Sequence, residues 1–435
     1  MSYIPRIIRG CSLSFILAFV TLFAFDAAYA QSYKVLYSFH GITDGADPGG
    51  ALLRDKHGNF YGTTERGGLS SLGTVFELTP DGTESILHTF LGNSHHNMDG
   101  ASPLGGLIED RAGNLYGTTN SGGSGTACDT ESPGCGTVFK IDAEGNESIL
   151  HYFCSHSNCA DGSYPAAPLV MDTSRNLYGT TSSGGSGHGP GCVGGCGTIF
   201  KLAPDGTETV LYNFCSVAPC ADGRFPQGAL IMDSAGDLFG TTEFGGGNGC
   251  RPNGGCGTVF RLAPNGTETV LYAFTGGSDG AMPEAALLMV AGNLYGTTAY
   301  GGRNGCKPAQ PVLDSCGTIF ELSPTNGETV LYAFEGQGDG AHPHAGVIAD
   351  ASSNLFGTAV YSGNNTNGTC PKIQFGCGTI FELSPNGSEK VLHTFSKKGG
   401  RPYGSLIEDN AGDFYGTAMF GGDYNDGVVF RIINN

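Results

Sequence analysis

Five polar side chains in this sequence are candidates for chemistry, and each lies directly before or after a proline. They are Glu284, His342, His344, Arg401 and Tyr403. An arginine can neutralise the carboxylate of a uronic acid while a histidine or a tyrosine abstracts a proton, which is the chemistry of a polysaccharide lyase. We take these five residues as the candidate catalytic group. We expect no metal site and no cofactor.

Six aromatic residues form a second candidate group. Four of them stand two residues after a Thr-Thr or Thr-Ala step, and two directly precede a proline: Phe244, Tyr300, Tyr361 and Phe420, then Tyr164 and Phe225. Aromatic faces stack on the C–H faces of sugar rings while polar neighbours bind the hydroxyls. These residues are therefore candidates for carbohydrate binding. The alternative is that the rings only cover neighbouring loops.

Both groups belong to a repeat that runs through the chain. An aromatic-Gly-Thr core recurs at spacings of 55 to 62 residues, beginning at Tyr61, Tyr116, Tyr178, Phe239, Tyr295, Phe356 and Tyr415. In the first six copies, Gly-Thr-(Val/Ile)-Phe follows, then a tight turn and a segment that ends in Phe. Short β-branched and aromatic segments between Gly- and Asn-containing turns indicate antiparallel strands. A period of this size without a helical pattern predicts propeller blades.

The seventh copy stops at Ile432 without its last strand, and the segment 34–39 at the other end of the chain has the pattern of that strand. We expect this N-terminal strand to complete the last blade. The predicted fold is an all-β, seven-bladed β-propeller of four-stranded antiparallel blades over residues 31–435.

The second repeat unit shows how each blade is expected to form. Strands are predicted at 104–110, 115–119, 136–141 and 147–153. The first and third connections are tight turns, whereas the second connection and the link to the next unit are long and variable. In a meander these two long loops emerge on one face, and function in repeat folds usually lies where loops vary on a rigid scaffold. The long-loop face is therefore the candidate ligand face.

Fourteen cysteines follow residue 30 and fall into seven close pairs, which lie in the long loops: Cys128/Cys135, Cys154/Cys159, Cys192/Cys196, Cys215/Cys220, Cys250/Cys256, Cys306/Cys316 and Cys370/Cys377. An even number of cysteines in an exported chain predicts disulfides. Zinc is the competing interpretation, but the spacings are irregular and no histidines recur at fixed offsets.

Residues 1–30 are typical of a Sec signal peptide. Arg6 and Arg9 precede a largely apolar run, and Ala28-Tyr29-Ala30 fits the cleavage rule. The apolar run is short for a membrane span. We predict a secreted protein, periplasmic or extracellular, with no membrane span after signal removal and a monomeric state. A formal net charge of -19 makes nucleic acid an unsuitable partner.

An Asp-Gly-x-x-Pro motif precedes the first strand of six units, with Asp44, Asp99, Asp161, Asp222, Asp279 and Asp339, whereas Lys398 takes the place of the aspartate in the seventh. A ring of carboxylates could bind calcium. Asp before Gly also caps turns by accepting hydrogen bonds from its own backbone. Because the motif recurs in nearly every unit, we expect the structural role.

The motif Gly-Asn-Leu-Tyr-Gly-Thr-Thr-x-x-Gly-Gly, followed by Gly-Thr-Val-Phe-x-Leu-x-Pro-x-Gly-x-Glu, resembles the GloVer (Gloeo/Verruco) tandem repeat of secreted bacterial proteins. The resemblance covers residues 34 to 433 and implies export and a β-propeller-like repeat fold. It implies no reaction and no catalytic residue.

Three functions are compatible with these features. The first is a binding or scaffolding protein for a carbohydrate-type ligand on the disulfide-bearing face, with a polysaccharide or cell-surface glycan as partner. The second is an extracellular carbohydrate-active enzyme, a lyase or a hydrolase, with its site at the channel mouth of blades 5–7. The third is a purely structural surface protein. We expect a protein that is not an enzyme.

Overall fold

The computed structural model describes Met1 and residues 32–92, 98–124, 128, 134–189, 191–192, 194–247, 249–250, 254–302, 315–336, 338–361, 376–396 and 398–433. All strands lie in one compact unit, Gln31–Asn434. The predicted signal peptide, apart from Met1, falls outside the described residues. Among the described residues, no helix has the length and apolar character of a membrane span.

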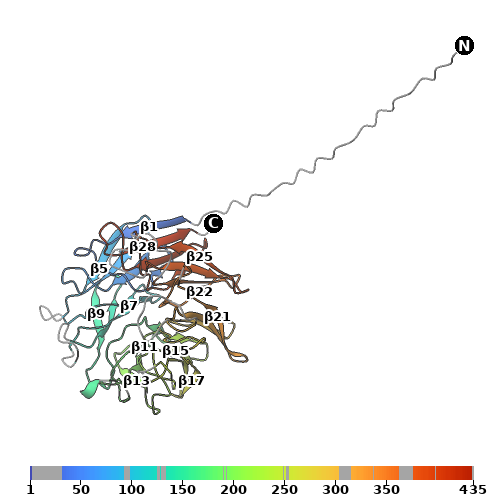
Figure 1. The fold of residues 1–435 in the computed structure, drawn as a ribbon. Helices are drawn as coiled ribbons and strands as arrows, with labels where there is room; N and C mark the ends of the chain where they lie inside the picture. The colour runs from blue at the N-terminus through green and yellow to red at the C-terminus, as the bar shows by residue number, and fades with distance from the viewer. Residues whose placement is uncertain are drawn as a thin grey trace. The chain divides into compact units, whose positions relative to one another are not determined.

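Seven separate four-stranded antiparallel sheets make up this unit, which confirms the predicted propeller (Figure 1). Six sheets follow the chain in order. The seventh has the order β1-β28-β27-β26, so the N-terminal strand completes the last blade. Figure 1 shows β1 beside β28, and their register runs from Ser32 opposite Ile433 to Ser38 opposite Val428. We number the blades from the sheet of β2 to the sheet of β26.

Each blade contributes one strand to each of four positions, A to D from the axis outward. The A strands are β2 (Leu53–Arg54), β6 (Ile108–Glu109), β10 (Val170–Met171), β14 (Ile231–Met232), β18 (Leu288–Val290), β22 (Ile348–Ala349) and β26 (Ile407–Glu408). The B strands are β3 (Phe60–Thr64), β7 (Leu115–Thr119), β11 (Leu177–Thr181), β15 (Leu238–Thr242), β19 (Asn293–Thr298), β23 (Leu355–Ala359) and β27 (Phe414–Ala418). The C strands are β4 (Thr74–Leu78), β8 (Thr137–Ile141), β12 (Thr198–Leu202), β16 (Thr258–Leu262), β20 (Thr318–Ser323), β24 (Thr379–Leu383) and β28 (Val428–Ile433). The D strands are β5 (Glu84–Thr89), β9 (Glu147–Tyr152), β13 (Glu208–Asn213), β17 (Glu268–Ala273), β21 (Gly327–Ala333), β25 (Glu389–Thr394) and β1 (Ser32–Ser38).

The A strands are shorter than the sequence suggests. We expected a strand over 104–110 in blade 2, whereas β6 contains only two residues. The reason is crowding at the axis: a Cβ added to Gly105 would lie 2.8 Å from the carbonyl carbon of Ala167 in blade 3. The segment before β6 therefore faces the next blade's backbone and does not extend the ladder with β7.

The same aromatic pair packs each blade against the next. The Phe after strand D meets the Phe of the following strand C edge to face, with ring centroids 5.0 to 5.3 Å apart: Phe39–Phe76, Phe90–Phe139, Phe153–Phe200, Phe214–Phe260, Phe274–Phe320, Phe334–Phe381 and Phe395–Phe430. Edge-to-face contacts add to the burial of these rings. The last and first pairs involve blade 7. The blades on either side of the ring closure are therefore joined by the same Phe–Phe contact as all the others.

The aromatic-Gly-Thr core is required by this packing. In each B strand the glycine lies opposite the Phe of strand C, and a Cβ there would lie 2.5 to 2.7 Å from the ring's ζ carbon. The first threonine of the core donates to a carbonyl of the next blade near the axis, at 2.9 to 3.5 Å. The bond from Thr417 to the Gly50 carbonyl completes this circle. The core is therefore structural, and we assign it no ligand.

Candidate functional site

A proline precedes strand A in each blade, and the residue directly before this proline has an unusual backbone conformation. Asp47, Ser102, Tyr164, Phe225, Met282, His342 and Arg401 all have φ between 54° and 58°. Side chains rarely adopt this left-handed region, so each position needs external support. In five blades the support is the backbone amide, which donates at 2.8 to 2.9 Å to the carbonyl of the second cysteine in the preceding blade's B–C loop.

The cysteines on this face form the predicted bonds. Five disulfides are present: Cys128–Cys135, Cys154–Cys159, Cys192–Cys196, Cys215–Cys220 and Cys250–Cys256. Cys316 and Cys377 are also disulfide-bonded, whereas their predicted partners, Cys306 and Cys370, lie outside the described residues. Because cysteine carbonyls hold the next blade's pre-proline residues, the disulfide loops help to shape the rim of the channel.

Two groups of cysteine sulfurs lie close together, within 4.8 Å of one another: Cys128, Cys135, Cys154 and Cys159, and separately Cys192, Cys196 and Cys215. No other trio of His, Cys, Asp or Glu ligand atoms is as close within the described part of the chain. Zinc binds thiolates, and these sulfurs are used in disulfides. They are therefore not available to a metal in this oxidation state.

A pocket of about 440 Å³ lies at the mouth of the central channel, and every blade contributes the residue after its proline. Gly49, Leu104 and Ala166 come from blades 1 to 3. Four polar residues come from blades 4 to 7, namely Gln227, Glu284, His344 and Tyr403. The rim is thus mostly apolar at blades 1 to 3, where Glu65 is the exception, and mostly polar at blades 4 to 7, where Met419 is the exception. We call this pocket the channel mouth.

Four of the five candidate catalytic residues line the channel mouth: Glu284, His344, Arg401 and Tyr403. Nδ1 of His344 lies 2.6 Å from a carboxylate oxygen of Glu284. The rings of His344 and Tyr403 are 5.2 Å apart. Burial, followed by the neighbouring Tyr361 hydroxyl, raises the pKa of Tyr403, so this phenol stays protonated at neutral pH.

Arg401 is held in place by two of the candidate aromatic residues. Its guanidinium carbon lies 5.2 Å from the ring centroids of both Tyr361 and Phe420. Such contacts orient a cation without consuming its hydrogen-bond donors, and Arg401 Nε is buried with no hydrogen-bond partner among the described residues. Because Arg401 also lines the channel mouth, its guanidinium group can offer donors to a ligand's carboxylate or hydroxyl group.

His342, the fifth candidate, lies behind the pocket and does not line it. It is 6% exposed, and its ring meets Tyr300 and Tyr361 edge to face at 4.5 and 5.4 Å. Burial, and then the charge of His344, lowers the pKa of His342 to about 4. At neutral pH it is an uncharged packing residue that supports Tyr300 and Tyr361.

The remaining aromatic candidates also pack within the protein. Phe225 and Phe244 place their rings 5.3 Å from the guanidinium carbon of Arg224, which is almost completely buried. Tyr164 is half-buried beside its proline. The aromatic residues on blades 4, 6 and 7 thus position arginines at the rim, a function that the sequence analysis did not consider.

Glu243 is a further candidate that the repeat pattern did not single out. Gln227 donates to its carboxylate at 2.5 Å. Desolvation, then the charge of Glu284, raises the pKa of Glu243 to about 7, against the opposing effects of Gln227, His344 and Arg224. Glu243 directly precedes Phe244, and its position varies among the repeats just as that of Phe244 does. Comparing the repeats one residue earlier could therefore have found it.

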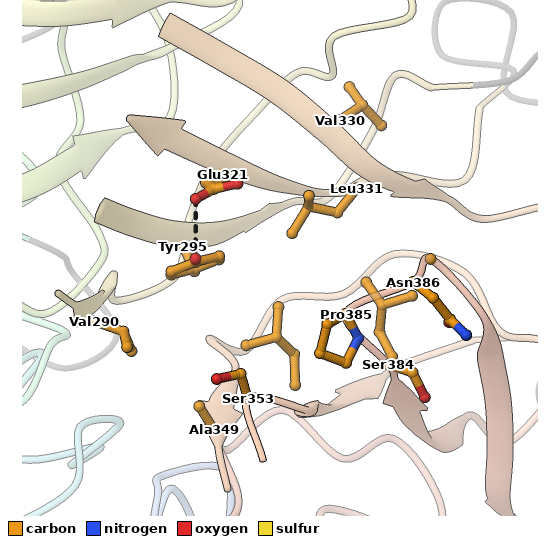
Figure 2. Close-up of a pocket in the computed structure, with 13 residues that line it drawn as sticks. Val290, Tyr295, Glu321, Val330, Leu331, Ala349, Ser353, Ser384, Pro385 and Asn386 are labelled. Atoms are coloured by element: carbon orange, nitrogen blue, oxygen red, sulfur yellow. Dashed lines mark hydrogen bonds between the residues drawn. The ribbon is translucent and has the colours of Figure 1, made fainter. Parts of the chain in front are cut away.

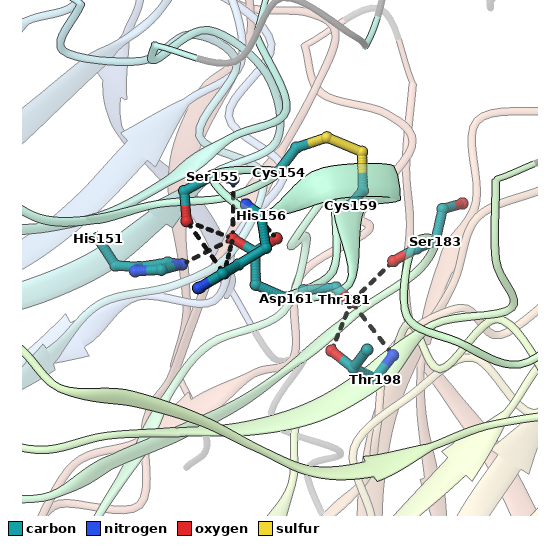
Figure 3. Close-up of polar contacts among 9 residues, drawn as sticks. All are labelled: His151, Cys154, Ser155, His156, Cys159, Asp161, Thr181, Ser183 and Thr198. Carbon is teal, nitrogen blue, oxygen red and sulfur yellow. Dashed lines mark hydrogen bonds and ion pairs between the residues drawn. A yellow bond between two sulfur atoms is a disulfide. The ribbon is translucent and has the colours of Figure 1, made fainter.

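The aspartates of the Asp-Gly-x-x-Pro motif tie the blades together. All six accept a backbone amide just after strand D, at 2.7 to 3.1 Å. Figure 3 shows Asp161, which accepts from the Ser155 amide and hydroxyl and lies near His151 and His156, beside the Cys154–Cys159 disulfide. These contacts accord with the structural role that we expected for the motif.

A glutamate near the start of the next D strand faces each aspartate, which creates six seam clusters. The six are Glu84, Glu147, Glu208, Glu268, Glu328 and Glu389, and each has one carboxyl oxygen buried without a hydrogen-bond partner among the described residues. Burial raises the pKa of all six. For Glu84, Glu268 and Glu389 it reaches about 7, with the facing Asp44, Asp222 and Asp339 as the second cause.

These glutamates predict a protein that is more stable in mild acid than in mild base. The folded state holds the protons of Glu84, Glu268 and Glu389 up to about pH 7, whereas unfolded glutamate releases its proton near pH 4.3. These glutamates stabilise the folded state fully below the pKa of unfolded glutamate. This stabilisation is lost as the pH rises through about 7. His342 and His393, whose pKa values burial lowers to about 4, act in the opposite direction below pH 6.5. We expect the melting temperature to fall between pH 6 and pH 8.

Thermal unfolding of Glu268→Gln tests this interpretation. The neutral amide should flatten the pH dependence, because one titrating seam is removed, whereas Glu144→Gln at an exposed turn should leave it unchanged. A wild-type melting temperature that rises from pH 6 to pH 8 would contradict the prediction.

The opposite face carries grooves between blades, and Figure 2 shows the one between blades 5 and 6. It has a volume of about 370 Å³ and is lined by Val290, Leu331 and Pro385, with the Tyr295–Glu321 hydrogen bond at one end. A similar groove of about 500 Å³ lies one seam earlier. Because the groove recurs with the repeat, we attribute it to blade packing and keep the channel mouth as the candidate site.

Comparison with known proteins adds the family and the fold. A model of the Gloeobacter/Verrucomicrobia repeat matches residues 20–189, 125–310, 189–375 and 314–435. No curated protein matches the sequence.

Solved structures with a similar fold include a fungal alcohol oxidase of the AA5 family in complex with copper, at 12% identity and a TM-score of 0.52, with 93% of this chain and 76% of that chain covered. Another is the extracellular domain of a putative one-component system from B. thetaiotaomicron, at 9% identity and a TM-score of 0.50. The match covers 92% of this chain but spans only 40% of that chain. At such identities the likeness concerns the fold alone.

Proposed function

The chain belongs to the Gloeobacter/Verrucomicrobia repeat family, and from this premise we propose that it is an exported binding or scaffolding protein that holds a carbohydrate-type ligand at the channel mouth. The observation that carries the proposal is the two-sided rim. Gly49, Leu104 and Ala166 offer a small apolar surface. Glu65 lines the same side, and the residues of blades 4 to 7 offer hydrogen-bonding groups opposite. Sugars have an apolar C–H face and a hydroxyl periphery, which suits such a pocket. The short-range disulfides are typical of exported proteins and support the predicted signal peptide.

Arg401 is the residue that we expect to select the ligand. Two rings fix its guanidinium, and the residue lines the channel mouth. Hydrogen bonds to charged groups contribute about 1.5–3 kcal/mol each. An acidic polysaccharide should therefore bind better than a neutral one of similar length.

Affinity measurements with polygalacturonate and with neutral dextran test this proposal. Arg401→Ala should weaken polygalacturonate binding roughly 10- to 100-fold, and Arg401→Lys should restore only part of it because the planar fork is lost. The matched control is Arg111→Ala, which removes an exposed arginine at the first tight turn of blade 2 that does not line the pocket. Equal binding by Arg401→Ala and the wild type would overturn the proposal. Absence of binding to any polysaccharide would favour a purely structural surface protein.

A carbohydrate-active enzyme is the second candidate function. It is favoured by two carboxyl groups in different environments: Glu284 is paired with His344 at 2.6 Å, whereas Glu243 holds its proton up to about pH 7. A carboxyl group that holds its proton near neutral pH can act as a general acid. The same incubations with polygalacturonate decide between the two functions, because a lyase or a hydrolase would shorten the polymer and a binding protein would not.

A further inference from the structure

The seam between blades 6 and 7 differs from the other six. Elsewhere an aspartate binds the end of strand D and a glutamate of the next blade faces it. In this seam Lys398 takes the place of the aspartate, and Tyr33 of β1 occupies the position of the glutamate. Both carboxyl groups of the repeated cluster are therefore absent from these two positions.

Tyr33 is packed into this seam as an aromatic side chain. Its ring stacks on His393 of β25, with centroids 4.0 Å apart and an interplanar angle of 3°. Its hydroxyl is buried and has no hydrogen-bond partner among the described residues. A Cβ on Gly399, directly after Lys398, would lie 2.6 Å from this hydroxyl. The hydroxyl is therefore closed off from solvent, whereas Lys398 is exposed.

An open groove of about 670 Å³ borders the seam. Lys398, Tyr33 and His40 line it, together with Asp423 and Tyr424 of the blade 7 B–C loop. Tyr424 is 56% exposed, and its ring lies 4.2 Å from that of His40. The groove therefore combines a cation and an exposed aromatic surface.

We propose that this groove binds the carboxylate of an acidic sugar, a uronate, which replaces the carboxyl groups that the chain supplies in the other six seams. Lys398 pairs with the sugar carboxylate, and the Tyr424 ring packs against the sugar's C–H face. Charge-assisted hydrogen bonds and aromatic stacking are the contacts that such a ligand requires. Asp423 faces the groove as well and is suited to accept a hydroxyl hydrogen.

This site goes beyond the proposed function, because it shares no residue with the channel mouth. The two sites can therefore fail independently. A local probe is available because the chain contains no tryptophan: Tyr424→Trp places a single fluorophore in the groove and keeps an aromatic ring there.

The experiment titrates the Tyr424→Trp protein with glucuronate and follows tryptophan emission. We expect a saturable change with glucuronate and none with glucose at equal concentration. Lys398→Asp, added to the reporter protein, restores the residue of the other six seams and should weaken the response at least about tenfold without unfolding the blade. Lys56→Asp makes the same charge change at an exposed turn and should leave the response intact, as should Arg401→Ala.

Several outcomes would overturn the proposal. One is tryptophan emission that does not change when glucuronate is added. Another is a glucuronate response that is unchanged in the Lys398→Asp variant. An equal response to acetate would identify a general anion pocket and not a sugar site. A response to an oligoglutamate peptide without one to glucuronate would identify an acidic peptide as the ligand.

Discussion

Removal of residues 32–39 is expected to prevent the propeller from forming a closed ring. Without β1, β28 loses its partner over the register from Ser32–Ile433 to Ser38–Val428, and the fully buried Phe39 no longer packs on Phe76. Loss of one buried Phe side chain alone costs about 3–5 kcal/mol. The whole strand should therefore cost more than about 5 kcal/mol, which is comparable with the stability of a typical domain.

Circular dichroism and thermal unfolding of the truncated chain test this expectation. A chain that begins at Ser32 is the matched control and should unfold like the full-length protein. A synthetic peptide of residues 32–40, added in excess, should restore the cooperative transition by strand complementation, whereas the same peptide with Phe39→Ala should not. A truncated chain that melts like the control would show that ring closure does not need β1.

The second large effect is expected at the contact between the repeated glycine and the strand C phenylalanine. Gly240→Ala should destabilise the protein by about 1–3 kcal/mol, because the new methyl would lie 2.7 Å from the ζ carbon of the buried Phe260 ring. Phe260→Ala should cost about 3–5 kcal/mol by leaving a cavity and removing the edge-to-face contact with Phe214.

The double variant Gly240→Ala/Phe260→Ala should be less destabilised than the sum of the two single changes. The methyl group added at position 240 then occupies space that the Phe260 ring has vacated, so the two positions are coupled. Denaturant unfolding measures all four proteins. Gly277→Ala is the control, because the nearest atom to its added Cβ lies at an ordinary contact distance of 3.6 Å. If the loss of unfolding free energy in the double variant equals the sum of the two single losses, the predicted clash is wrong.

Much of the fold could be predicted from the sequence because the same pattern of strand and turn residues occurs in all seven repeats. The aromatic-Gly-Thr cores, the turn residues and the displaced strand at 34–39 identified blades, antiparallel pairing and closure, since local patterning and steric fit point to one answer in every copy. The cysteine spacing likewise identified the five disulfides described in full. The short A strands were not predictable, because backbone crowding at an axis depends on neighbouring blades.

The candidate site, like the fold, could be predicted from the sequence only in part. Differences between repeats singled out Glu284, His344, Arg401 and Tyr403, and these residues line one pocket. Sequence could not reveal that His342 is buried behind it, or that Tyr361 and Phe420 enclose Arg401. It also left Glu243 and the partnership of Tyr33 with His393 unnoticed.

The sequence by itself determined the repeated unit and the number of blades, because strands, turns and steric fit depend on residues close together in the chain. Only the tertiary structure decided which side chains meet across blades, including the two-sided channel mouth and the seventh seam. The physical reason is that each seam is built from residues of two different repeats, often more than 40 positions apart, as with Tyr37 and Glu84. The environment of each side chain there is set by packing around the ring.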